Sequence, residues 1–349
     1  MKRRQWLTHA AVAALARTSL AAAPKRWPTP NLAEDQVLRC VAGIRPYRKG
    51  GVRIEREEAA GKALVHNYGH GGAGYTLSWG SAKAAVDLVK HESRGACAVL
   101  GAGVVGLSTA ALLLEAGFAV HVYAQAFPPH TTSDVAGAEW SPDIVDRGET
   151  PAQRRRFDQM LLDSWHRFMQ LRGDRWCVYP RAIYEADDVI SGLDELPAGI
   201  MAPGKRVRHL PFAPHHAGRV FQTLLIEAPA YLQTLVAYIK GKGAVLHERS
   251  IHNAADVSAL KERLVFNCIG MGAAAAFADE AMVPIRGQLV HLRPQALPYI
   301  LDHVDGYVLS RRDALILGGS FEAGVDDPHP DNATRARILQ VNRRFFARS

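Results

Sequence analysis

Apolar positions between residues 97 and 125 follow the order of a strand, a turn, a helix and a second strand. The apolar run that ends at Leu100 is typical of a buried parallel strand, and residues 107–116 have a helical apolar pattern that Gly117 ends. The run AVHVYA at 119–124 predicts the next strand. Together these segments predict one βαβ unit, with the glycine turn at the carboxyl edge of a parallel sheet.

The second half of the chain has a different pattern. A helix is predicted over 151–173, because Pro151 follows Thr150 and bulky apolar side chains recur at helical spacing. Strands separated by turns, in a mostly antiparallel arrangement, are predicted at 176–186, 285–294 and 305–321. Between them the pattern of the first half returns in a helix and two strands, at 230–240, 244–250 and 263–270. The predicted fold class is α/β: a Rossmann-like nucleotide-binding domain plus a smaller, mostly antiparallel α+β domain.

Length and charge exclude some classes of protein. A chain of 349 residues, 48% of them hydrophobic, is long enough for about two domains. The formal charge of +8 includes four basic residues and no acid in residues 1–23, so removing that segment would leave +4. The other basic residues are scattered among acids, which favours a solvated surface over a nucleic-acid face. Beyond the N-terminus no segment has the about 18 consecutive apolar residues of a membrane span, so we expect no integral membrane segment in the mature chain.

The N-terminus has the form of an export signal. Residues 1–23 combine the paired Arg3 and Arg4 with a short apolar stretch and small residues before Pro24, and the RRQWL core resembles a twin-arginine signal. This predicts export, to the periplasm if the signal is of the twin-arginine type. The alternative is an amphipathic N-terminal helix of a cytoplasmic protein.

The motif GAGVVG at 101–106 indicates a dinucleotide site. Gly101, Gly103 and Gly106 fit G-x-G-x-x-G after a strand and at a helix start, where the backbone can approach a pyrophosphate and the helix N-terminus stabilises its charge. The motif does not separate NAD from FAD. The acid expected after the second strand, which would accept from the ribose hydroxyls, is replaced by Gln125, a weaker hydrogen-bond partner.

A second glycine cluster, GHGGAGYT at 69–76, precedes a helix predicted to begin near Trp79. Consecutive glycines let the backbone lie against a flat ring system such as an isoalloxazine, and the alternative is a flexible hairpin. His66 and His70 are four residues apart, but the glycines beside them make a helical metal pair implausible. The four cysteines lack CxxC spacing, which favours buried free thiols over disulfides or a zinc site, and we predict no metal.

Arg45, in GIRPYR, is a candidate for binding a carboxylate through two parallel hydrogen bonds. A surface or structural arginine is the alternative.

Taken together, these segments resemble the D-amino-acid oxidase family of FAD enzymes. The resemblance is carried by LGAGVVGLSTA, VYAQAFPPHTTSDVAGAEW, FNCIG, IRGQLVHL, LILGGSF, GIRPYRKGGVRIERE and VHNYGHGGAGYTLSWG. It covers nearly all of residues 32–349, but in a rotated order, because the GIRP and GHGG segments that close the chain in the family precede GAGVVG here. The chain therefore resembles a circular permutant of the family, with new ends at a surface connection.

The resemblance implies site residues and a domain division. Arg45 would pair with a substrate carboxylate, Tyr307 would donate its hydroxyl to the same group, and the carbonyl of Gly72 would accept from the substrate amine. The residues that would hold FAD are Gly101, Gly103, Gly106, Gln125, Thr131, Thr132 and Ile251, with the backbone of Gly71, Gly72, Ala73, Gly74, Tyr75 and Thr76. The predicted FAD-binding domain comprises 44–150 and 221–283, and the substrate domain 24–43, 151–220 and 284–349. His303 stands where some members have a second active-site tyrosine, in a shorter lid.

The resemblance also implies an activity. It implies oxidative deamination of D-amino acids by hydride transfer from the α-carbon to the flavin, with O2 as electron acceptor and 2-oxo acid, ammonia and H2O2 as products. The alternatives are a related flavin amine oxidase or dehydrogenase, acting on glycine or a secondary amine, and a non-catalytic FAD-binding protein. The expected partners are a small-molecule D-amino acid and O2, with no nucleic acid, and a homodimer stays open.

Overall fold

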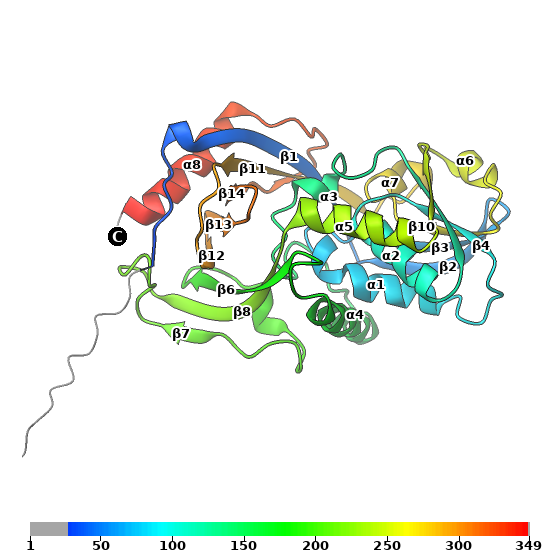
Figure 1. The fold of residues 1–349 in the computed structure, drawn as a ribbon, viewed down its shortest axis with the longest axis horizontal. Coiled ribbons are helices and arrows are strands. Elements are labelled where there is room, and N and C mark those ends of the chain that lie inside the picture. Colours follow the sequence, from blue (N-terminus) through cyan, green and yellow to red (C-terminus); the bar gives the residue numbers. More distant parts are fainter. Residues whose placement is uncertain (1–26, 348–349) are drawn as a thin grey trace, which may run out of the picture.

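A computed structural model describes residues 27–347 of the chain, so the predicted export signal at 1–23 lies outside the described residues. Two β-sheets lie side by side, each with its own helices (Figure 1). One sheet carries the nucleotide-binding motif, and the other forms most of the second half of the molecule. Within residues 27–347, no helix is both long enough and apolar enough to cross a membrane.

The first sheet has six strands in the order β2-β3-β10-β4-β5-β9. Their bounds are Arg53–Ala59 (β2), Lys62–Tyr68 (β3), Leu264–Asn267 (β10), Ala96–Leu100 (β4), Ala119–Ala124 (β5) and Val245–Glu248 (β9). All neighbours are parallel except β2 and β3, which form an antiparallel hairpin at one edge. Strands β4 and β10 are almost wholly buried, as their continuous apolar runs predict. The predicted βαβ unit is confirmed, with α2 (Val104–Glu115) between β4 and β5.

Four long helices pack together beside this sheet (Figure 1). They are α1 (Gly74–Asp87), α2, α4 (Pro151–Gln170) and α5 (Ala228–Gly241). A Cβ at Gly80 of α1 would overlap the carbonyl of Met160, so this glycine lets α4 lie directly on α1. The apolar side chains of α4, including Phe157 and Trp165, join the hydrophobic cluster of α1 and α2. Helix α4, which the predicted division assigns to the substrate domain, packs on the nucleotide-binding half.

The second sheet has nine strands, in the order β1-β11-β14-β13-β12-β6-β8-β7 with β15 paired to β11. The bounds are Val37–Arg48 (β1), Met282–Leu292 (β11), Leu315–Gly318 (β14), Gly306–Ser310 (β13), Tyr299–His303 (β12), Val178–Ala186 (β6), Gly218–Ile226 (β8), Lys205–Val207 (β7) and Glu322–Ala323 (β15). Only the pair β12 and β6 is parallel, so the mostly antiparallel prediction is confirmed. The predicted boundaries at 44 and 221 fall inside β1 and β8, because each of these strands continues to the interface between the two halves.

Shorter elements complete the chain. They are the 3-10 helices Glu34–Gln36 (η1) and Gly192–Glu195 (η2) and the helices Thr132–Val135 (α3), Ala254–Ser258 (α6) and Gly272–Ala276 (α7). All four cysteines are free, as predicted, but only Cys97 and Cys268 are buried.

The first described residues lie against the last helix, α8 (Asn332–Ala347). Arg343 donates from Nε to the carbonyl of Leu32 at 2.7 Å, and Glu34 forms ion pairs with Arg335 and Arg343. Trp27 stacks on Tyr299 with the ring centroids 5.8 Å apart, in the hydrophobic cluster that α8 also covers. The two ends of the described chain are therefore neighbours.

Candidate active site

A cavity of about 800 Å³ lies between the two sheets, at the upper end of the range for ligand pockets. The nucleotide-binding half contributes both glycine clusters, and the second sheet contributes β1, β11, β12 and β13. Most of the predicted site residues line this one cavity: Arg45, Gly71, Gly72, Gly74, Tyr75, Gly101, Gly103, Gln125, Thr131, Thr132, Ile251 and Tyr307.

The loop 101–106 has the geometry that a pyrophosphate needs. Gly101 has a φ of +97°, which favours glycine. A Cβ at Gly106 would overlap the carbonyl of Gly101, so this glycine lets α2 pack close to the strand and does not itself line the cavity. Helix α2 begins after Gly103 without a side-chain cap, and the Val104 amide donates to Ser133 Oγ at 3.0 Å. An uncapped helix N-terminus facing a cavity is suited to an anion.

The segment 69–76 differs from the prediction in where its helix starts. Helix α1 begins at Gly74, not near Trp79, because the turn is complete at Gly71 and Gly72. The Gly71 amide donates to the Pro46 carbonyl and the Gly72 amide to the Ile144 carbonyl, each at 2.9 Å. Two of the predicted cofactor residues in this segment are not on the cavity wall. Ala73 is fully buried, and the Thr76 hydroxyl donates to the Ser141 carbonyl at 2.7 Å.

Gln125 and Ile251 line the far end of the cavity together with Arg249. Gln125 follows β5 and is exposed, and the Arg249 amide donates to the Ala124 carbonyl at 2.9 Å, which fixes this corner. Thr131 caps α3, where its hydroxyl and amide both donate to Asp134 Oδ2. Thr132 contributes to the wall beside it.

Arg45 points from β1 into the other end of the cavity. Its Nη1 donates to the carbonyls of Ser320 at 3.1 Å and Arg286 at 3.4 Å, and it forms no ion pair with any residue in the described range 27–347. Burial lowers the pKa of the Arg45 guanidinium, but an arginine stays charged in a protein. A partly buried guanidinium without an ion-pair partner in this range is available to a ligand carboxylate.

Tyr307 on β13 lies beside Arg45. Its ring covers Gly318, where a Cβ would overlap it, and burial raises the pKa of its hydroxyl above the ordinary range, so the phenol is protonated. His303 borders the cavity, but its ring is fixed by two residues of α8. Nε2 forms a hydrogen bond with Asn342 Oδ1 at 3.1 Å, and the ring stacks on Phe345. The structure thus gives His303 a packing role.

The carboxyl groups on the cavity wall were not predicted from the sequence. Asp305 and Asp326 are exposed, whereas Glu139, Asp143, Glu185 and Asp302 are buried or half-buried. Burial is the largest effect on each of these four; it raises the pKa of Glu139 and of Glu185 to about 7 and also raises the pKa of Asp143 and Asp302. For Glu139 the sequence contained one indication, because in GAEW this acid directly precedes a tryptophan. Trp140 is fully buried, and its neighbour Glu139 lies at the cavity.

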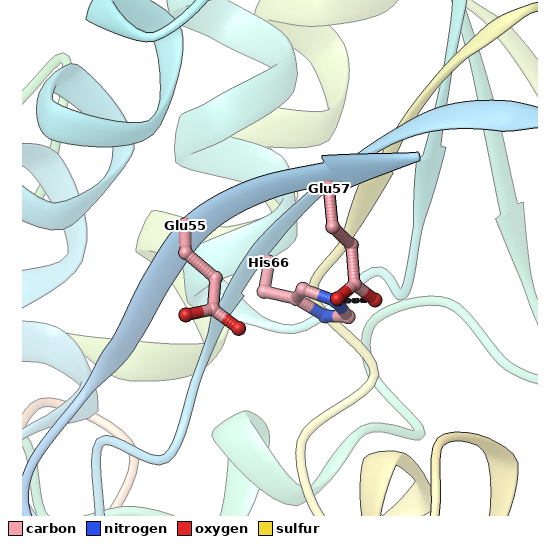
Figure 2. A group of neighbouring side chains, drawn as sticks. All are labelled: Glu55, Glu57 and His66. Carbon is pink, nitrogen blue, oxygen red and sulfur yellow. Dashed lines mark hydrogen bonds and ion pairs between the residues drawn. The ribbon is translucent and has the colours of Figure 1, made fainter. Parts of the chain in front are cut away.

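Figure 2 shows the one group within residues 27–347 whose ligand atoms are close enough to hold a metal ion, Glu55, Glu57 and His66. Both ring nitrogens of His66 are engaged, Nε2 with Glu57 at 3.0 Å and Nδ1 with the Asn267 amide at 3.0 Å. Arg53 forms ion pairs with both glutamates. These contacts account for the three side chains without a metal. His70 bonds to Ser81 Oγ at 2.8 Å instead of joining His66.

The family model described as "FAD dependent oxidoreductase" matches residues 4–88 and 96–348. The chain belongs to this family. The match is in two segments that together span nearly the whole chain.

Curated proteins similar to this FAD-dependent oxidoreductase include D-amino-acid and D-aspartate oxidases. A D-amino-acid oxidase of Rubrobacter xylanophilus is 31% identical over 261 residues, which are 69% of this chain and 74% of the relative. A human D-aspartate oxidase is 27% identical over 69% of this chain and 73% of its own length.

Solved structures share the fold. A glycine oxidase from Geobacillus kaustophilus has a TM-score of 0.53 at 16% identity, over 72% of this chain and 77% of its own. An L-proline dehydrogenase from P. horikoshii has a TM-score of 0.55 at 15% identity, over 73% and 78%.

FAD is the cofactor of this family, and the cavity fits it. Helices α1 and α2 both begin at the cavity without a side-chain cap, at Ala73 and Gly103. The Val104 amide donates to Ser133 Oγ, and the other amides of the two first turns suit the pyrophosphate and the polar edge of a flavin. The wall has no side chain at Gly71 and Gly103, and there is no room for one. A Cβ at Gly71 would overlap the Ile144 carbonyl, and a Cβ at Gly103 would lie 3.0 Å from Ser133 Oγ.

Proposed function

We propose that this FAD-dependent oxidoreductase oxidises D-amino acids. The overall reaction would convert a D-amino acid, O2 and water into a 2-oxo acid, ammonia and H2O2. Relatives at 27–31% identity that are named D-amino-acid oxidase and D-aspartate oxidase support the substrate class. The observation that carries the proposal is Arg45, a partly buried guanidinium at the cavity whose hydrogen bonds within residues 27–347 go to backbone carbonyls.

The residues around Arg45 suit an α-amino acid. The guanidinium would bind the α-carboxylate, and the protonated Tyr307 would donate to the same group. Gly72 lies beside Arg45, since a Cβ there would be 3.6 Å from Arg45 Cδ, and its carbonyl would accept from the α-amine. These contacts would fix the α-carbon by both of its polar substituents.

When bound, FAD supplies the acceptor for the hydride that leaves the α-carbon. The chain's own contribution is then positioning, because a fixed substrate needs no further acid or base if the amine is neutral when it reacts. Gly101, Gly103 and the start of α2 would hold the pyrophosphate, Gln125 the ribose, Ile251 the adenine side, and the backbone from Gly71 to Tyr75 the flavin.

The test is a spectrum followed by a substrate panel. The purified protein should show flavin absorbance, which anaerobic D-alanine or another D-amino acid should bleach. In air, peroxide should form with D-amino acids and not with their L-enantiomers. Bleaching by a D-amino acid without peroxide would point to another electron acceptor such as a quinone.

Other outcomes would replace the proposal. Activity confined to glycine or secondary amines would make the chain a related amine oxidase or dehydrogenase. Flavin absorbance that no amine bleaches would indicate a non-catalytic FAD-binding protein.

A further inference from the structure

A row of polar side chains crosses the second sheet along the cavity. Tyr307 on β13 is paired with Asp302 on β12, and Asp302 is paired with Glu185 on β6. Directly paired residues on neighbouring strands present their side chains on the same face of a sheet. All three line the cavity. The sheet register therefore places two carboxyls next to the tyrosine that borders Arg45.

The loop between α3 and α4 adds two more carboxyls from another direction. Glu139 lies near the Tyr307 hydroxyl, because a Cβ at Gly137 would be 3.3 Å from Glu139 Oε2 and 3.4 Å from the Tyr307 oxygen. Asp143 lies against the backbone of Gly192. Glu139, Asp143 and Glu185 are all close enough to Asp302 to affect its ionisation. The four acids thus form one cluster at the Tyr307 end of the cavity.

Two of the four acids each have one buried oxygen without a hydrogen-bond partner among the described residues. Glu185 bonds to Ser191 Oγ at 2.5 Å and pairs with Arg219 at 3.3 Å. Glu139 Oε2 and Asp302 Oδ1 are buried oxygens without any hydrogen-bond partner among the described residues, and both residues line the cavity. Buried carboxyls without partners are costly, and a cation is the partner that relieves this cost most.

Within residues 27–347, Arg45 and Arg311 are near enough to influence the ionisation of Glu139, but neither forms an ion pair with Glu139 or Asp302. Arg311 forms a two-bond pair with Asp313 and donates to the Ala136 carbonyl. Arg45 forms no ion pair with Glu139 or Asp302 and faces backbone carbonyls. A cationic partner for Glu139 and Asp302 must therefore come from the ligand.

Building on the proposed function, we propose that the acid cluster binds a cationic substrate side chain, so that the preferred substrates are basic D-amino acids such as D-arginine and D-lysine. Arg45 and Tyr307 take the α-carboxylate, while Glu139 and Asp302 face the guanidinium or ammonium at the other end of the same molecule. A guanidinium presents several N–H groups in a fixed fork and can bond to both carboxylates.

The test compares D-arginine with D-citrulline, which has the same shape but a neutral urea group. The FAD-loaded enzyme should have a kcat/KM for D-arginine at least about tenfold higher, as expected for hydrogen bonds to charged groups. Glu139→Gln and Asp302→Asn should each reduce this ratio, mainly through KM for D-arginine, and leave D-citrulline within about twofold. Glu280→Gln, which removes an exposed acid away from the cavity, should keep the ratio.

Two outcomes overturn the inference and leave the proposed function standing. One is equal kcat/KM for D-arginine and D-citrulline in the unaltered enzyme. The other is a loss in Glu139→Gln that is as large for D-alanine as for D-arginine, because the acids would then be holding the α-amine.

A binding measurement decides the inference even if no amino acid is oxidised. The ligands are 5-guanidinopentanoate, which is arginine without its α-amine, and its neutral counterpart 5-ureidopentanoate. Calorimetry on the FAD-loaded enzyme should give a dissociation constant at least about tenfold lower for the guanidino compound. Equal affinities would refute the cation site. Because this comparison uses the unaltered protein, it also stands if a variant fails to fold.

Discussion

The guanidinium of Arg45 lies directly over Gly287, its diagonal neighbour across the β1 and β11 pair. A Cβ at position 287 would overlap three atoms of that guanidinium, whereas the backbone of Gly287 does not need a positive φ. The position of the Arg45 guanidinium is therefore set by the sheet register and by one missing side chain.

We predict that Gly287→Ala displaces Arg45 without unfolding the sheet. Alanine fits a strand, so the main effect is a guanidinium pushed away from its two backbone acceptors. The expected result is a 10- to 100-fold lower kcat/KM for D-amino acids, the range for a lost charge-assisted contact. Gly95→Ala, in an open surface segment with no neighbour within 4 Å, is the control and should match the parent. Equal kinetics for both variants would contradict this relationship.

We predict that Arg45→Ala loses substrate oxidation and keeps the flavin. The side chain lies at the Tyr307 end of the cavity, away from the amides at the start of α2. Turnover of D-alanine should fall by about 100-fold or more, as expected when two charge-assisted hydrogen bonds are removed. The flavin absorbance per protein should stay at the level of the parent. If the variant oxidises D-alanine like the parent, Arg45 does not bind the carboxylate.

The sequence predicted the parts of the site that depend on local backbone chemistry. GAGVVG lies between a buried strand and an apolar helix, and this local order was enough to place it at the carboxyl edge of the sheet. The start of α1 was misplaced by five residues, because glycines argue against a helix and only packing on α2 and α4 shows that Gly74 is inside one.

The acid cluster could not be predicted because its members come together only through tertiary contacts. Asp302 and Glu185 are separated by more than a hundred residues, and their pairing depends on the parallel neighbours β12 and β6. In YILDH, Asp302 follows three apolar residues of a short strand, and nothing in this run indicates that its carboxyl borders a cavity. The half of the molecule on which α4 packs could not be predicted for a related reason, since its amphipathic pattern fits a core in either half.

We predict that Gln125→Glu strengthens FAD binding. A carboxylate accepts from ribose hydroxyls more strongly than a neutral amide does, by about 1 kcal/mol or roughly fivefold in the dissociation constant. Arg249 lines the same corner and would favour the new charge. Titration of FAD into the apoprotein measures the change, and Gln125→Ala should bind more weakly than the parent. An affinity that is unchanged in both variants would remove Gln125 from the ribose site.

We predict that the preference for D-arginine over D-citrulline rises with pH. The pKa of Glu139 is raised to about 7 by burial and then by Asp143, against the lowering effects of Arg45 and Arg311, and Asp302 and Tyr307 also face it. From pH 6 to pH 8 a group with this pKa goes from about 10% to about 90% ionised, so the ratio of kcat/KM should rise several-fold. In Glu139→Gln the rise should be much smaller.

Thermal unfolding gives a readout of Glu139 that does not depend on substrate. The pKa of Glu139 is about 7 in the folded protein and near 4.5 for an ordinary glutamate, as in the unfolded chain. Between pH 4.5 and pH 7 the carboxyl is therefore protonated more often in the folded protein than in the unfolded chain. Its contribution to stability is complete below about pH 4.5 and is lost as the pH rises toward 7. Glu139→Gln should therefore gain melting temperature relative to the parent at pH 8 and not at pH 5. The same difference at both pH values would mean that Glu139 does not titrate in this range.

We propose that the chain is a circular permutant of its family and predict that it can be returned to the other order. The family match divides at residues 89–95, in the mostly exposed connection between α1 and β4. The first described residues lie against α8, where Arg343 bonds to the Leu32 carbonyl. A gene that begins at Ala96, runs to Ala347 and continues through about ten glycine and serine residues into Trp27 and on to Ser93 would keep every strand pairing.

The reordered protein should bind FAD and oxidise the same amino acids with kcat/KM within about threefold of the parent. A linker of ten flexible residues spans roughly 17 Å, which suits ends that share one hydrophobic cluster. A matched control places the new ends inside α2, after Leu107, where the cut would break the helix that begins at the cavity. The control should not bind FAD. If the first protein also does not bind FAD, the present order of segments is required for the fold and the permutation proposal is wrong.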